Sequence, residues 1–117
     1  SPDSYLFGIF LKQDGRHVGN IKIGNIHPKH QFADIGIIIG DRDIWGQGFA
    51  TEAIRLCVRF SFEELKLHKL FAGMVAGNEG SFRAFKKAGF GDSGHFRKHY
   101  WMDGEYRDAY IVELLNE

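Results

Sequence analysis

The chain has 117 residues, of which 44% are hydrophobic and 15% aromatic, and its 15 basic residues balance its 15 acidic ones. This length suits one domain over residues 1–117, and the neutral balance disfavours a nucleic-acid surface, which needs a basic excess. No apolar run is long enough for a transmembrane helix, and the first residues lack a signal-peptide pattern. The single Cys57 cannot form an internal disulfide, so we expect a cytoplasmic protein.

The first third of the chain is typical of three strands. Tyr5 to Lys12 is aromatic and aliphatic, and the Asp14-Gly15 pair that follows is a strong hairpin signal. We therefore expect residues 17–26 to return as an antiparallel partner. After a loop, the β-branched segment from Phe32 to Ile39 predicts a strand buried on both faces at its end, with a bulge at Gly36.

The middle of the chain is predicted to form a parallel crossover. Apolar residues at helical spacing indicate a helix over residues 51–65, including Leu56, and residues 70–75 read as the next strand. A strand, a helix and a strand in this order imply a right-handed crossover. The sequence therefore indicates an α/β protein with a mixed sheet.

The last third of the chain is predicted to hold a short helix and a hairpin. The helix is expected over residues 82–88, with Ser81 as its N-cap and Gly89 just past its end. Residues 91–100 and 108–115 read as two final strands. The Asp103-Gly104 pair between them favours a hairpin connection.

The segment between the third strand and the first helix carries the strongest functional signal. It runs from Asp41 to Ala53 and includes Gly46 and Gly48, which permit backbone angles that other residues resist. The first turn of the following helix presents main-chain N–H groups and the positive end of the helix dipole. Together these features suit a phosphate or pyrophosphate, although a tight turn without a ligand remains an alternative.

Two well-known phosphate loops are excluded. No Gly-Lys-Ser/Thr sequence follows the glycines, which rules out a nucleotide-hydrolysing P-loop. The position where a dinucleotide-binding loop has its third glycine is Thr51, and no acidic residue ends a second strand where that fold requires one.

Two sequence blocks together resemble a known family. The first reads Trp45-Gly46-Gln47-Gly48-Phe49-Ala50-Thr51-Glu52-Ala53, and the second reads Asn78-x-x-Ser81-x-x-Ala84-x-x-Lys87-x-Gly89-Phe90. Both are similar to the GNAT superfamily of acetyl-CoA-dependent N-acetyltransferases. The likeness is greatest to the branch that contains the ribosomal-protein N-terminal acetyltransferases and many small-amine acetyltransferases.

The resemblance implies a fold and a place for the cofactor. A mixed, mostly antiparallel sheet should splay at a central parallel strand pair with flanking helices, and acetyl-CoA should enter the gap. Members usually begin with a strand and two helices that form a wall of the acceptor pocket, whereas only four residues precede Tyr5 here. We therefore expect that this segment is absent, or that a partner completes the wall.

The resemblance also implies which residues contact acetyl-CoA. Main-chain amides from the glycine loop should hold the pyrophosphate, and the end of the third strand should offer main-chain groups to the pantetheine and the thioester carbonyl. Asn78 should bond the pantetheine, with three further side chains along the cofactor. The full predicted set is Ile37, Ile38, Ile39, Gly46, Gln47, Gly48, Phe49, Ala50, Thr51, Asn78, Ser81, Phe85 and Lys86.

Acyl transfer to an amine needs a base, and the thiolate that leaves can require a proton. Asp34, in the strand that leads to the loop, is the predicted base, with His27, His30 or water as alternatives and a solvated carboxylate as the plainer interpretation. Many members carry a proton-donating Tyr where this chain has Phe85, so Ser81 is the predicted donor. His27 and His30 lack further ligands nearby, so no metal is expected.

The acceptor is the least defined part of the prediction. We expect a primary amine of a small molecule, such as an amino sugar, attacked directly in a ternary complex. A protein N-terminus is an alternative, and so is a non-catalytic module that binds acyl-CoA. Tyr100, Tyr106 and Asp108 line the acceptor site or are simply half-buried strand residues. A homodimer is also left open, and no nucleic acid or membrane is expected to bind.

Overall fold

The strands β1 (Tyr5–Phe10) and β2 (His17–Gly24) form the hairpin predicted from the Asp14-Gly15 pair. β2 then pairs antiparallel with β3 (Phe32–Ile39). The structure is a computed structural model that describes residues 3–40 and 42–117, so Asp41, at the start of the predicted loop segment, lies outside the described residues.

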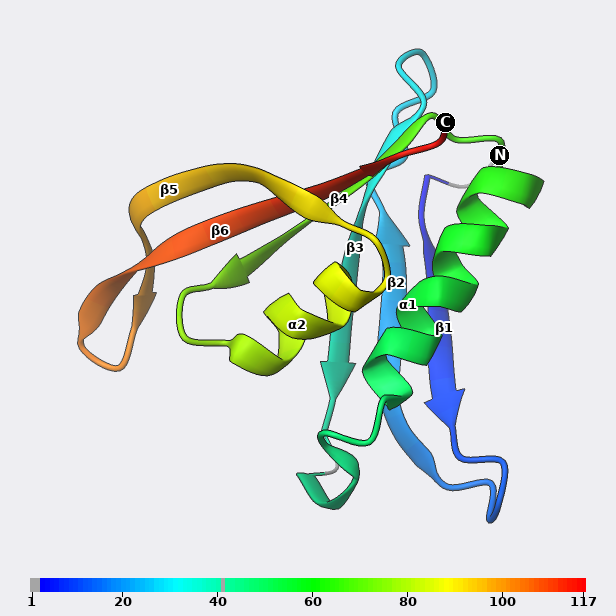
Figure 1. Cartoon of the computed structure of the whole chain (residues 1–117), viewed down its shortest axis with the longest axis horizontal. Helices are drawn as coiled ribbons and strands as arrows, with labels where there is room; N and C mark the ends of the chain where they lie inside the picture. The colour runs from blue at the N-terminus through cyan, green and yellow to red at the C-terminus, as the bar shows by residue number, and fades with distance from the viewer. Residues whose placement is uncertain (1–2, 41) are drawn as a thin grey trace.

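The sheet has six strands in the order β1-β2-β3-β4-β6-β5 (Figure 1). β3 and β4 (Lys69–Val75) form its parallel pair, whereas the other neighbours in this order are antiparallel. The predicted mixed, mostly antiparallel fold is therefore confirmed.

The parallel pair separates soon after it forms. β3 and β4 share three residue pairs, the last being Asp34 with Phe71, although β3 continues to Ile39 and β4 to Val75. Figure 1 shows the two strands pointing in different directions beyond this point, with a short helix in front of the opening. This divergence is the splay that the family resemblance implies.

Two helices lie on one face of the sheet (Figure 1). A short 3-10 turn, η1 (Arg42–Ile44), precedes α1 (Phe49–Arg59), which continues into the wider turn η2 (Phe60–Glu64) and so covers nearly all of the predicted first helix. The second helix, α2 (Glu79–Lys87), starts three residues earlier than predicted. Gly89, with φ of 104°, follows its end as expected.

The core lies between these helices and the sheet. Its most buried side chains come from the middle strands and from the inner faces of α1 and α2: Ile23, Ala33, Ile54, Leu70, Ala72, Phe85 and Val112. Leu56, predicted to belong to the apolar stripe of the first helix, is 57% exposed. It lies beside a groove between β1 and α1 and not in the core.

Two expectations about β3 are wrong. Ala33 and Ile35 are buried whereas Ile38 is 73% exposed, so β3 buries one face and not two. The reason is that the helices cover one side of the sheet only, and alternate side chains of a strand point to opposite sides. Gly36 pairs with Lys22 without a register shift, so it marks no bulge.

The final hairpin is longer than predicted. β5 (Gly91–Met102) and β6 (Glu105–Leu115) meet at Asp103 and Gly104, which both have positive φ, as a two-residue hairpin turn requires. The bulges of this sheet include two in β5, between Asp92 and Gly94 and between Phe96 and Tyr100. In the described ranges, no helix is long and apolar enough to cross a membrane.

Candidate active site

Two side chains anchor the loop between β3 and α1. The Trp45 Nε1–H donates to the main-chain oxygen of Ile39 over 2.9 Å, which ties the loop to the end of β3. The Gln47 side-chain amide donates to the main-chain oxygen of Asp43 over 3.0 Å, which closes the loop onto η1. The side chain of Gln47 is therefore structural, and what this residue has to offer a ligand is its main chain.

Gly48 is the N-cap of α1 and has φ of 87°, and Gly46 has φ of 81°. A Cβ added at either position would meet nothing within 4 Å, so both glycines serve the backbone conformation and leave open space before it. Within the described residues no side chain caps α1. The amides of Phe49, Ala50 and Thr51 therefore open the helix without side-chain partners, as a diphosphate site requires.

The register of β2 and β3 decides which main-chain groups face the splay. The Gly40 N–H donates to the oxygen of Val18 over 3.0 Å. Hydrogen-bonded and non-hydrogen-bonded pairs alternate along an antiparallel ladder, so the pair two positions further on, Asn20 with Ile38, is hydrogen-bonded as well. The main chain of Ile38 therefore faces β2, which corrects its expected role at the thioester. The groups of Ile37 and the N–H of Ile39 point the other way, beyond the last pairing with β4.

The first turn of α2 differs from the prediction in its cap. Asn78, and not Ser81, is the N-cap, because its Oδ1 accepts the Ser81 N–H over 3.2 Å. The Asn78 side-chain oxygen is thereby engaged, which leaves its amide group as the donor for a ligand. Ser81 lies in the first turn of the helix and is half-buried, and its hydroxyl takes no part in the cap.

Two further predicted cofactor contacts lie elsewhere. Phe85 is 2% exposed and packs edge-on against Phe90 with ring centroids 5.1 Å apart, so it is a core residue. Lys86 Nζ lies 3.1 Å from the carboxylate of Asp92 and 5.4 Å from the ring centroid of Phe82. It therefore faces β5, because residues four apart share a helix face and Phe82 is on that side.

Asp34 lies where β3 and β4 are still paired. Its Oδ1 accepts a hydrogen bond from the side-chain amide of Asn25 over 3.2 Å. Since its neighbours Ala33 and Ile35 point into the core, the Asp34 side chain faces the side of the sheet that carries no helix. The structure thus places Asp34 and Ser81 on opposite sides of the sheet, with Asp34 at the point where the sheet divides.

Comparison with known proteins identifies the chain. Residues 1–91 match the family described as the Acetyltransferase (GNAT) domain, which is well over half of the sequence. The chain belongs to the GNAT acetyltransferase family.

Its relatives are longer proteins. The "Probable N-acetyltransferase YjcK" of Bacillus subtilis is 39% identical over 97% of this chain and 63% of its own length. The spermidine N(1)-acetyltransferase of Escherichia coli K12 is 31% identical over 82% of this chain and 51% of its own length. A chimera of the Vibrio cholerae spermidine N-acetyltransferase SpeG and hSSAT superposes with a TM-score of 0.88 at 26% identity, covering 97% of this chain and 67% of that chain.

The alternative bases His27 and His30 form a small cluster of their own. Their rings stack with centroids 4.5 Å apart, and the His30 N–H donates to His27 Nδ1 over 3.2 Å. Both belong to the loop that precedes β3, at the opposite end of this strand from the glycine loop. In the part of the chain that the structure describes, no three His, Cys, Asp or Glu side chains form a metal-binding group.

Sequence reasoning missed a polar pair between β5 and β6. His95 Nε2 lies 2.8 Å from Asp108 Oδ2, and the Lys98 N–H donates to Asp108 Oδ1 over 2.8 Å. These bonds lower the pKa of Asp108, the one from the Lys98 amide first and the one from His95 second. No local pattern links His95 to Asp108, because the bulge between Phe96 and Tyr100 sets their alignment.

The structure also shows the packing of Tyr106 and Cys57. Tyr106 packs against Trp101 with ring centroids 4.9 Å apart near the tip of the hairpin, and it is 60% exposed. Cys57 is buried in the core, and this burial raises the pKa of its thiol to about 11. The thiol is therefore protonated near neutral pH, in keeping with a reaction that needs no enzyme nucleophile.

Proposed function

We propose that this chain transfers the acetyl group of acetyl-CoA to the primary amine of a small molecule. The observation that carries the proposal is the divergence of β3 and β4 after Asp34 and Phe71, next to a helix start whose amides no side chain caps. The first feature gives the pantetheine a slot, and the second gives the diphosphate a cradle.

In the proposed reaction the amine attacks the thioester carbonyl directly. The N–H groups of Ile37 and Ile39 face the slot and would stabilise the developing oxyanion. Asp34, oriented by Asn25, would accept the amine proton from the helix-free side of the sheet, and the Ser81 hydroxyl would protonate the departing thiolate. Holding both reactants in one slot supplies several kcal/mol of the acceleration, on the order of the effect of proximity in enzymes.

Two of the relatives support a proposal for the acceptor class. They are named as spermidine N-acetyltransferases, which act on a small aliphatic amine. We therefore place a polyamine ahead of an amino sugar as the acceptor of this chain. One related structure is titled as dodecameric, and we propose self-association here too, which light scattering of the purified protein would measure.

The proposed activity is tested by thiol release from acetyl-CoA with a panel of amines. The panel would hold spermidine, glucosamine and a peptide with a free N-terminus, and the proposal predicts the fastest release with spermidine. Fastest release with the peptide would favour a protein N-terminal acetyltransferase instead. Binding of acetyl-CoA without release for any amine would overturn the enzyme assignment in favour of a non-catalytic module.

A further inference from the structure

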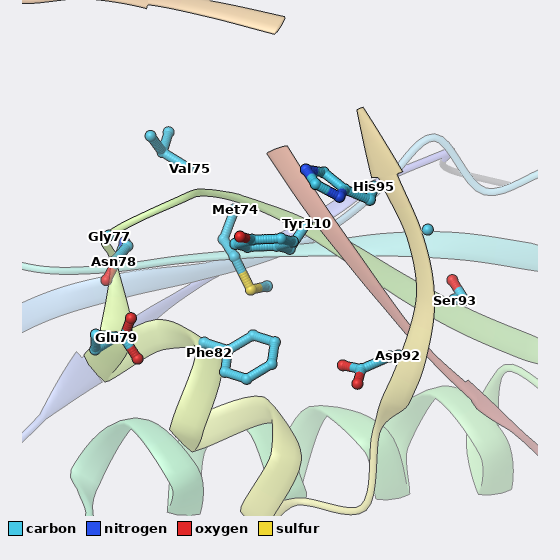
Figure 2. Close-up of a pocket in the computed structure, with 11 residues that line it drawn as sticks. Met74, Val75, Gly77, Asn78, Glu79, Phe82, Asp92, Ser93, His95 and Tyr110 are labelled. Carbon is cyan, nitrogen blue, oxygen red and sulfur yellow. The ribbon is translucent and has the colours of Figure 1, made fainter. Parts of the chain in front are cut away.

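A second cavity lies on the far side of α2 from α1 (Figure 2). It has a volume of about 640 Å³, within the range of ligand sites. The end of β4, the start of α2 and the facing parts of β5 and β6 enclose it. No described residue of the glycine loop lines it, so it is separate from the proposed diphosphate cradle, although Asn78, the expected pantetheine contact, also lines it.

The walls of this cavity are partly aromatic. Phe82 of α2 and Tyr110 of β6 lie with ring centroids 6.1 Å apart, and Met74 of β4 lies beside both rings (Figure 2). The His95 ring continues this wall, 4.9 Å from the centroid of Tyr110. Aromatic faces with a sulfur beside them suit an alkyl chain or a cation.

The charged side chains that line the cavity are acidic. Glu79, in the first turn of α2, and Asp92, at the start of β5, both line it, and no Lys or Arg in the described part of the chain does. Ionised Asp108 can only accept hydrogen bonds, so His95 donates to it from Nε2. The two lining carboxylates attract a positively charged ligand and repel an anion.

A β-bulge explains why so much of β5 reaches this cavity. Successive residues of a regular strand point to opposite faces, yet Asp92, Ser93, Gly94 and His95 all line the cavity. The register shift between Asp92 and Gly94 leaves Ser93 as an extra residue and turns the strand locally. The backbone thus brings a carboxylate, a hydroxyl and an imidazole to one wall.

The chain itself places an ammonium group at the rim of this cavity. Lys86 Nζ lies 3.1 Å from Asp92 Oδ1 and 5.4 Å from the ring centroid of Phe82, two residues that line the cavity. This pair of contacts, one carboxylate and one aromatic face, is what a bound amine would use. Lys86 therefore marks the site and would compete for it.

From these observations we infer that the cavity binds an alkylammonium ion. Its charged nitrogen would lie against the carboxylate of Asp92 or of Glu79, which line the cavity from opposite sides (Figure 2), and its alkyl chain would pack on Phe82 and Tyr110 beside Met74. This inference goes beyond the proposed acetyl transfer, because the binding needs neither acetyl-CoA nor the splay between β3 and β4.

The test is a titration of the full chain with n-butylammonium chloride, followed by NMR of the Met74 methyl group and of the Glu79 and Ser93 amides. Neutral n-butanol and anionic butyrate, which have the same chain length, are the controls. We expect saturable shifts with n-butylammonium, much weaker ones with butanol and none with butyrate. Equal responses to butylammonium and butanol, or no saturable response, would overturn the inference.

Variants locate the binding. Glu79→Gln and Asp92→Asn should each weaken n-butylammonium binding by about two- to fivefold, as expected for partly exposed charge pairs. Glu64→Gln, which changes an exposed carboxylate in η2, is the matched control and should leave the affinity unchanged. Lys86→Met should tighten binding, because it removes the competing ammonium, and weaker binding in this variant would contradict the assignment.

Discussion

The two sides of α2 contrast in how they are built. On the α1 side, the proposed diphosphate cradle consists of main-chain N–H groups from one short segment, which Gly46 and Gly48 leave open. On the β5 side, the cavity consists of side chains from β4, α2, β5 and β6, and its charges are acidic. One helix thus separates a site suited to an anion from a site suited to a cation.

The largest effect is expected at Asp34. A substitution there should slow acetyl transfer and leave cofactor binding unchanged, because Asp34 is not part of the proposed diphosphate cradle. Asp34→Asn should lower kcat by about a hundredfold, the usual contribution of a general base. The loss should be greatest below the pKa of the acceptor amine, where the reaction depends most on proton removal. Steady-state rates across pH measure this, and a pH–rate profile that matches the parent would show that Asp34 is not the base.

The second largest effect is expected at Gly48 and tests whether the glycine loop binds CoA. Gly48→Ala should lower the affinity for CoA by about tenfold or more, because Ala resists a φ of 87° and its Cβ enters the space before the amides. It should also destabilise the fold by about 1–2 kcal/mol, the cost of this conformation for a residue with a Cβ.

Gly15→Ala is the matched control for this glycine. Gly15 has φ of 73° and open space around it, but it lies in the β1–β2 turn. The Gly15→Ala variant should lose about as much stability as Gly48→Ala, measured by chemical denaturation. Its affinity for CoA, measured by calorimetry, should be unchanged. Equal loss of CoA affinity in both variants would mean that the effect is global and not local to the loop.

Asn78 lies at the start of α2 between the two sites, and a pair of substitutions separates its two roles. Asn78→Ala should destabilise the protein by about 1 kcal/mol through loss of the N-cap. Asn78→Ser should restore the cap and most of the stability, but without the amide donor its CoA affinity should stay reduced. Thermal unfolding and calorimetry measure these effects, and full recovery of affinity in the serine variant would limit Asn78 to capping.

The smallest effect concerns the acidic side. Because hydrogen bonds lower the pKa of Asp108 in the folded state, its contribution to stability is present above its unfolded-state pKa and is lost as pH falls through the folded-state value. Asp108→Asn should therefore be less stable than the parent near pH 7, and the difference should vanish in acid. Denaturant midpoints across pH measure this, and a constant difference would contradict the assigned bonds.

The difference between the two sites also explains what could be predicted from sequence. The glycine loop, the hairpins and the crossover are local patterns, since Gly48 and the Asp103-Gly104 pair act through their own backbone angles. The His95–Asp108 pair depends on a strand register shifted by bulges, which no pattern of residues near His95 reveals. The burial of β3 on one face depended on where the helices packed, and so it too was missed.

The N-cap of α2 is another feature that the sequence could not predict fully. Asn78 and Ser81 are both good N-cap residues three positions apart, and the sequence alone gives no reason to prefer one. The structure begins the helix at Glu79 because the Asn78 side chain reaches the Ser81 amide. Lys86 was likewise assigned to the cofactor, because the family resemblance shows only which sequence position matches a cofactor contact. Its ion pair with Asp92 depends on the path of β5, which the sequence does not reveal.

The proposed function depends above all on the main-chain amides from Gln47 to Thr51, which would hold the diphosphate of CoA. The most direct measurement is a pair of titrations followed by amide NMR, one with CoA and one with pantetheine, which lacks the diphosphate. We expect CoA to bind far more tightly than pantetheine and to shift the amides of residues 47–51 most strongly. Equal affinity for the two compounds, or shifts that leave residues 47–51 unchanged, would contradict it.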